Sequence, residues 1–204
     1  MRQAKQPPTK PLRVLGLDIS SKFVGWVVFD DLEPHIHGLY RHVGVGHGER
    51  LGNYLTWLCA LFEQYHPNEV VVELPFAGRR RNTFGILTLY ISVTILAHYQ
   101  YTGKEMPDDN KLQAREIKHL MQVQRGKDHD ENKAIMVEVI NRLYGLQLRF
   151  DSHDSVKKFS EDDIADAYAV VVAWLVKTKH LDPFGPKQNI PKKKAKRDHR
   201  RVRR

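Results

Sequence analysis

The chain has 204 residues, of which 41% are hydrophobic and 28% charged, the composition of one globular domain with a single core. This balance excludes a disordered or fibrous chain, and the lack of about 20 consecutive apolar residues excludes a transmembrane helix. The N-terminal segment has no apolar signal-peptide core, and the single cysteine, Cys59, cannot form an intrachain disulfide. We therefore expect a protein of a reducing, cytoplasmic compartment.

The positive charge is concentrated at the two ends of the chain. Residues 1–13 carry four basic residues and no acid, and residues 191–204 carry nine basic residues and one acid. Basic ends bind polyanions by releasing counterions, so nucleic acid is the expected partner, ahead of an anionic membrane surface. A solubilising or localisation tail is the alternative. We expect a basic arm over 1–12, one domain over 13–180 and a disordered basic tail over 181–204.

The first half of the chain has the pattern of strands interrupted by one helix. Alternating and β-branched residues predict strands at 13–20, 24–30 and 35–42, with the first two forming a hairpin. Apolar residues at helical spacing predict a helix over 49–65. The valine run that follows, at 69–73, predicts a central strand buried on both faces.

The second half is predicted to be helical. A long apolar helix covers 82–101, an amphipathic stretch follows over 113–122, and a further helix covers 130–143. The last helix is predicted to begin with Ser160 as its N-cap and to continue to Thr178, with an apolar body that has to be buried. This order of elements indicates a single α/β domain with a mixed β-sheet flanked by helices.

Four acidic residues occupy positions that folding alone does not require. Asp18 interrupts an apolar strand and Glu73 ends the valine-rich strand, so parallel pairing would bring both to one end of a sheet. Asp163 and Asp166 are three residues apart and project from one face of the last helix. Oxygen ligands suit Mg²⁺ or Mn²⁺ rather than zinc. Two alternatives stay open: Asp162 replaces Asp163 as the partner of Asp166, or the first-turn acids only complement the helix dipole.

In their order along the chain and in their residue patterns, these motifs resemble those of the RuvC-type Holliday-junction resolvases of the RNase H-like superfamily, over about residues 13–178. The segment GLDISSKFVGWVVFD is similar to the family's first hairpin, which places its catalytic acid at Asp18, and VVVELPF is similar to its second acidic strand, with Glu73. DDIADAYAVVVAWL is similar to its terminal helix, which assigns the last two acids to Asp163 and Asp166. The resemblance implies an RNase H-like fold and a bacterial or bacteriophage origin.

The resemblance also implies residues that contact DNA. Phe76 lies where the family carries an aromatic residue that stacks on bases near the junction, and a core position is the alternative. The segments AREIKHLM and ENKAIMVEVI resemble those in which the family places lysines near the scissile phosphate, which assigns catalytic and DNA-binding roles to Lys118 and Lys133. Three further cations would contact phosphate unless they are only solvated: Arg79, Arg80 and Arg81.

We therefore expect a metal-dependent endodeoxyribonuclease that resolves four-way (Holliday) junctions by paired symmetric nicks, with no membrane partner. By resemblance, two Mg²⁺ or Mn²⁺ ions per active site would be held by Asp18, Glu73, Asp163 and Asp166. Two symmetric cuts require a twofold homodimer, and the apolar helix over 82–101 is either its interface or a buried helix of the monomer. The alternatives are a broader RNase H-like nuclease for forks, flaps or RNA-containing duplexes, and a non-catalytic protein that binds branched DNA.

Overall fold

The structure, a computed structural model, describes residues 11–76, 81–124, 126–152 and 161–181. Most of the expected basic arm and tail therefore lies outside the described residues. The elements are β1 (Arg13–Ile19), β2 (Phe23–Asp30), β3 (Glu33–Arg41), α1 (His47–Tyr65), β4 (Glu69–Leu74), α2 (Arg81–Thr102), a 3₁₀ turn (Asp108–Asn110), β5 (Lys111–Gln113), α3 (Ala114–Leu120), α4 (His129–Tyr144) and α5 (Asp162–Lys177).

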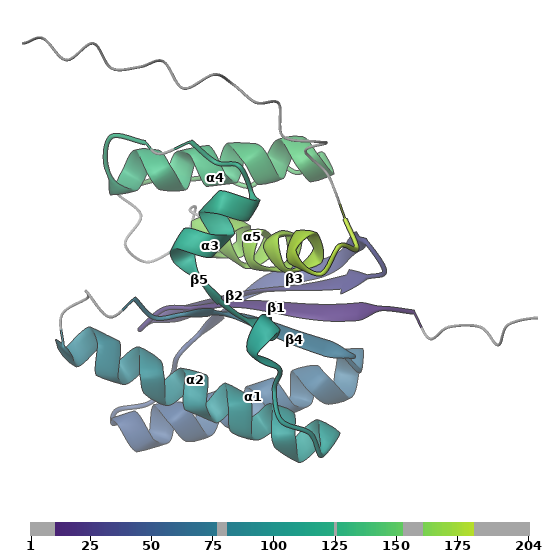
Figure 1. The fold of residues 1–204 in the computed structure, drawn as a ribbon. Coiled ribbons are helices and arrows are strands. Elements are labelled where there is room, and N and C mark those ends of the chain that lie inside the picture. Colours follow the sequence, from purple (N-terminus) through teal and green to yellow (C-terminus); the bar gives the residue numbers. More distant parts are fainter. Residues whose placement is uncertain (1–10, 77–80, 125, 153–160, 182–204) are drawn as a thin grey trace, which may run out of the picture.

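A five-stranded mixed sheet with the order β3-β2-β1-β4-β5 forms the middle layer of the molecule (Figure 1). β2 pairs antiparallel with both β1 and β3, whereas β4 pairs parallel with both β1 and β5. The expected hairpin, third strand and central strand are thus confirmed, together with the mixed α/β sheet. β5 was not predicted, because its three residues, which lie between the predicted turn and the stretch 113–122, are too few for an alternating pattern to emerge.

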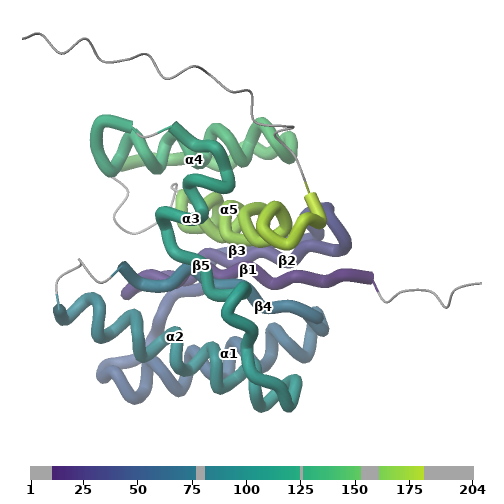
Figure 2. Tube along the Cα trace, viewed as in Figure 1, coloured from purple at the N-terminus to yellow at the C-terminus, as the bar shows by residue number. Residues whose placement is uncertain are grey.

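Helices cover both faces of the sheet. α1 and α2 lie on one face, and α3, α4 and α5 lie on the other (Figures 1 and 2). α5 packs directly on β1 and β2 and is itself covered by α3 and α4. Because it is enclosed on every side, α5 is buried along almost its whole length, as its continuous apolar sequence predicted.

Side chains along β1 point alternately to the two faces of the sheet. Leu15 and Leu17 join the core beneath α1 and α2, whereas Val14 joins the core that contains α5. Successive residues of a strand point to opposite faces, so Gly16 and Asp18 also face α5.

Two glycines bring α5 close to the sheet. A Cβ atom on Gly16 would meet Val171 Cγ2 at 2.3 Å, and one on Gly25 would meet the carbonyl oxygen of Asp163 at 1.8 Å. Gly25 stands directly across the β1–β2 ladder from Asp18. The lack of a side chain at Gly25 therefore lets the first turn of α5 lie against the strand pair at the position of Asp18.

The start of α5 corrects the sequence prediction. The helix begins at Asp162 with Glu161 as its N-cap and without a side-chain capping hydrogen bond, while Ser160 lies outside the described residues. Glu161 instead accepts a hydrogen bond from the Arg149 backbone N–H at 3.0 Å, and Asp162 accepts one from Lys133. The carboxylates around this helix start therefore connect it to other segments.

α2 has features of both alternatives that its sequence left open, a homodimer interface and a buried helix of the monomer. Leu87 and Ile91 are buried on the face toward the sheet. The opposite face exposes 47% of Leu89, 49% of Leu96 and 49% of Tyr99. The helix is thus part of the monomer core and also presents an apolar stripe to its surroundings. Among the described helices, none combines the length and apolar character needed to cross a bilayer.

Candidate active site

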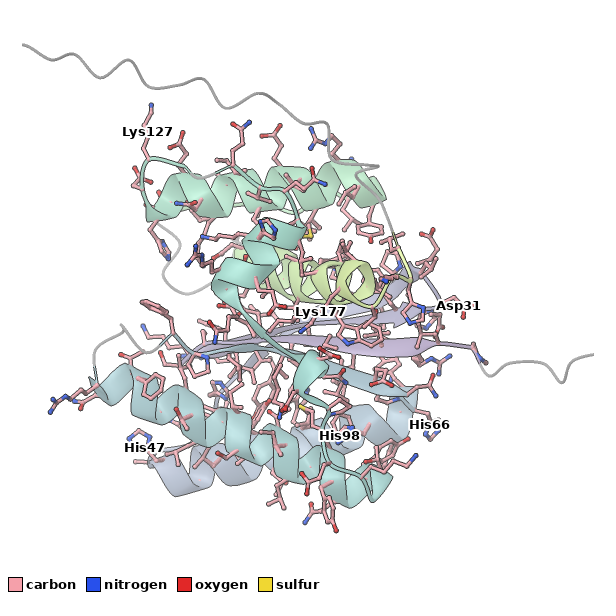
Figure 3. The ribbon with its side chains drawn as sticks, viewed as in Figure 1. Asp31, His47, His66, His98, Lys127 and Lys177 are labelled. Atoms are coloured by element: carbon pink, nitrogen blue, oxygen red, sulfur yellow. The ribbon has the colours of Figure 1, made fainter. Side chains whose placement is uncertain are left out.

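A cavity of about 450 Å³ lies at the carboxyl ends of β1 and β4. In Figure 3, Lys127, just before α4, and Asp31 of the β2–β3 turn lie on opposite sides of the molecule. The cavity-lining His129 follows Lys127 by two residues. All four acids and both lysines singled out from the sequence contribute to its walls: Asp18, Glu73, Lys118, Lys133, Asp163 and Asp166. The fold therefore brings together side chains from β1, β4, α3, α4 and α5.

The parallel pairing of β1 and β4 places the two strand acids at the same end of the sheet. The last registered pair of this ladder is Leu17 with Val72. Asp18 and Glu73 each follow that pair by one residue. The side-by-side placement that the sequence suggested is thus a consequence of strand register.

α5 completes a cluster of carboxylates. One side-chain oxygen each from Asp18, Asp163 and Asp166 lies within 4.8 Å of the others, and Glu73 lines the same cavity. Asp162 belongs to neither the cluster nor the cavity wall, because its carboxylate binds Lys133. Of the two acids left open by the sequence, the geometry selects Asp163 for the cluster.

The carboxylates of the cluster are hard to ionise together. Burial raises the pKa of Asp18 well above its ordinary value, and the negative charges of Asp166, Glu73 and Asp163 raise it further. Burial also raises the pKa of Asp166 to about 6, although Lys133 opposes this shift. Closely spaced carboxylate oxygens with this mutual repulsion form a donor set that suits a hard divalent cation such as Mg²⁺ or Mn²⁺.

Two lysines place positive charge beside these acids. Lys133 of α4 hydrogen-bonds to Asp162, and its Nζ lies 3.6 Å from Asp163 Oδ1. Burial alone would lower the pKa of Lys133, but the surrounding carboxylates, Asp166 first, raise it above its ordinary value. Lys118 of α3 is exposed and lowers the pKa of Asp166 through its charge. Lys133 is therefore a cation at neutral pH.

Sequence reasoning missed three polar residues of the cavity wall: Ser20, His129 and Asn132. The signal for His129 was present, because it precedes Lys133 by four residues and therefore shares a face of α4 with it. Ser20 follows Asp18 by two residues at the start of the β1–β2 turn, where its hydroxyl accepts a hydrogen bond from the Phe23 backbone N–H at 3.0 Å.

The predicted DNA contacts are placed only in part. Phe76 is 67% exposed and follows the cavity-lining Pro75, so the alternative of a core position is wrong. Arg81 is the first residue of α2 and is exposed. Arg79 and Arg80 lie outside the described residues.

Comparison with known proteins identifies the fold. No protein-family model matches the chain, and no curated protein sequence does. A structure of Thermus thermophilus RuvC in complex with a Holliday junction substrate is similar to it, with a TM-score of 0.62 and 13% identity over 82% of this chain and 97% of that chain. A second T. thermophilus RuvC structure gives a TM-score of 0.59 and 16% identity over 82% and 97%.

A third solved structure, the yeast mitochondrial Holliday junction resolvase, gives a TM-score of 0.56 and 15% identity over 86% of this chain and 84% of that chain. The chain therefore has the RNase H-like fold of RuvC, as the sequence resemblance implied.

Proposed function

We propose that the protein is a metal-dependent endodeoxyribonuclease that resolves four-way (Holliday) DNA junctions. The observation that carries this proposal is the convergence of Asp18, Asp163 and Asp166 to within 4.8 Å, in a cavity that Glu73 and Lys118 also line. The shared fold supports it, because one neighbour is in complex with a Holliday junction substrate and another is a Holliday junction resolvase.

The carboxylates supply the ligands that this chemistry needs. Asp18, Glu73, Asp163 and Asp166 would hold Mg²⁺ or Mn²⁺, two ions in each active site. When bound, such ions generate a nucleophile from water and stabilise the leaving oxygen of a phosphodiester. Without cations, the same carboxylates repel a DNA backbone, so the charge of this cavity fits a phosphate substrate only in the metal-loaded state.

The cations and the exposed aromatic residue position the DNA. Lys118 is exposed on α3 beside the acids, where its ammonium can bind the oxygens of the scissile or neighbouring phosphate. Lys133 adds a second ammonium on the α4 side of the cavity. Phe76 offers a stacking surface for an unpaired base at the branch point, and the arginine run ending at Arg81 offers further phosphate contacts.

The test is cleavage of a synthetic four-way junction, a fork and a linear duplex in the presence of Mg²⁺, Mn²⁺ or EDTA. We expect paired symmetric nicks in the junction with either metal and no cleavage in EDTA. Equal cleavage of the fork would favour a broader branch nuclease. Tight binding of the junction without cleavage in any metal would contradict the proposal and favour a non-catalytic DNA-binding protein.

Paired nicks require two active sites, and the apolar stripe of α2 is the proposed homodimer interface. We expect Leu96→Glu to convert a dimer into a monomer, because an unpaired carboxylate buried at an interface costs about 3–5 kcal/mol. Sedimentation velocity would measure the change, and the junction products would shift from paired to single nicks. Ala60→Glu adds the same charge at an exposed position of α1 and is the control. An unaltered dimer in Leu96→Glu would place the interface elsewhere.

A further inference from the structure

Asp162 is a buried acid outside the carboxylate cluster. Its side chain is only 1% exposed, although its neighbour Asp163 belongs to the cluster. An ionised carboxylate at such a depth is strongly unfavourable unless an opposite charge and hydrogen bonds compensate it. Among the described residues, the ammonium of Lys133 compensates this charge by reaching across from α4 to hydrogen-bond with Asp162 Oδ2.

The Lys133 ammonium lies between an acid outside the cluster and an acid inside it. It donates its hydrogen bond to Asp162, whereas Asp163 Oδ1 is 3.6 Å away, beyond direct hydrogen-bond distance. A small rotation of the lysine side chain would bring the ammonium onto Asp163. There it would compete with a divalent cation for the same carboxylate, because both are attracted to the same oxygens.

We propose that Asp162 is a positioning residue that keeps the Lys133 ammonium from hydrogen-bonding directly to Asp163 and so limits the competition of the lysine with the metal. The inference rests on the proposed metal site and concerns an acid that lies beside this site without belonging to it.

The test is calorimetric titration of the full chain with Mn²⁺ alone, without DNA, in a double-mutant cycle. We expect Asp162→Asn to weaken Mn²⁺ binding by about 10-fold, the scale found when groups that orient metal ligands are lost. Lys133→Met should tighten binding only slightly by itself, because Asp162 already holds the ammonium and Lys133 acts on the cluster through its charge without a direct hydrogen bond. In the Asp162→Asn background, Lys133→Met should restore most of the loss.

Two outcomes of the cycle would overturn the inference. If Lys133→Met tightens Mn²⁺ binding equally in both backgrounds, the two residues act only through their long-range charge. If Asp162→Asn weakens binding and Lys133→Met does not restore it, Asp162 is a metal ligand itself. Wild-type protein that binds no Mn²⁺ would overturn both the proposed metal site and this inference. Failure of the inference alone is recognised because the wild type then still binds Mn²⁺.

A second measurement needs no variant. The ammonium protons of Lys133 are observable by NMR when a hydrogen bond to a buried carboxylate protects them from exchange. We expect their signal to persist when saturating Mg²⁺ is added, because the metal would leave the contact between Lys133 and Asp162 intact. Loss of the signal on addition of Mg²⁺ would mean that the metal takes Asp162, and would contradict the proposal.

Discussion

Asp18→Asn is expected to abolish metal-dependent cleavage while it makes the metal-free protein more stable at neutral pH. The loss of activity follows from the central place of Asp18 in the carboxylate cluster. A metal ion contributes several kcal/mol of transition-state stabilisation, and a loss of about 4 kcal/mol corresponds to a rate decrease of about 10³-fold. Binding of the four-way junction should be retained, because the amide removes a charge that repels phosphate.

The gain in stability follows from the direction of the pKa shifts. Burial and the neighbouring acids raise the pKa of Asp18, and burial raises that of Asp166 to about 6. An acid with a raised pKa in the folded state binds its proton more tightly there than in the unfolded chain. Ionising such an acid therefore lowers the free energy of unfolding. This loss of stability is absent below the pKa of the unfolded chain, about 4, and grows as the pH rises through the pKa of the folded state. Asp18→Asn removes the penalty of one acid and reduces that of Asp166.

Thermal unfolding in EDTA across a range of pH measures this effect. One pKa unit corresponds to about 1.4 kcal/mol, so we expect Asp18→Asn to stabilise the protein by about 1–3 kcal/mol near neutral pH. The difference between variant and wild type should shrink as the pH falls toward about 4. Glu138→Gln changes an exposed acid of α4 and should alter neither stability nor cleavage. A variant that melts below wild type in EDTA at neutral pH would show that the ionised carboxylate of Asp18 stabilises the metal-free fold.

The strand half of the site was predictable because its signals are local. Asp18 interrupts one apolar strand and Glu73 follows a run of three valines, which also predicts that the second strand is central. Parallel register then places the two acids together, as the pairing of Leu17 with Val72 confirms. Nothing beyond strand order was needed for this part of the prediction.

The helical half of the site was less predictable, because both Asp162 and Asp163 stand in the first turn of α5. Which of them faces the cavity depends on the rotation of the helix over the sheet. That rotation is fixed by long-range contacts, namely the approach of Asp163 to Gly25 and the ion pair between Asp162 and Lys133. Neither contact can be predicted from the local sequence of the helix. The predicted cap, Ser160, lies outside the described residues, and the helix begins one residue later than predicted, with Glu161 as its N-cap.

Gly25→Ala is expected to lower both stability and metal binding, although Gly25 carries no ligand atom. The added Cβ atom would lie 1.8 Å from the carbonyl oxygen of Asp163 and 2.8 Å from the backbone nitrogen of Ile164. These are backbone atoms of a buried helix, so the helix has to move as a unit. Overpacking of this kind costs about 1–3 kcal/mol and sometimes more. A displacement of about 1 Å at a reacting site can lower the rate by about 10²-fold.

Thermal unfolding and calorimetric Mn²⁺ titration of Gly25→Ala measure the two effects separately. We expect a melting temperature several degrees below that of wild type, and weakened Mn²⁺ binding at temperatures where the variant is still fully folded. Gly52→Ala is the matched control, because a Cβ atom on Gly52, in the exposed part of α1, meets no atom within 4 Å. It should gain up to about 1 kcal/mol from helix propensity and bind Mn²⁺ as wild type does. If Gly25→Ala matches wild type in both measurements, α5 does not depend on close contact with β2, and another feature must hold Asp163 beside Asp18.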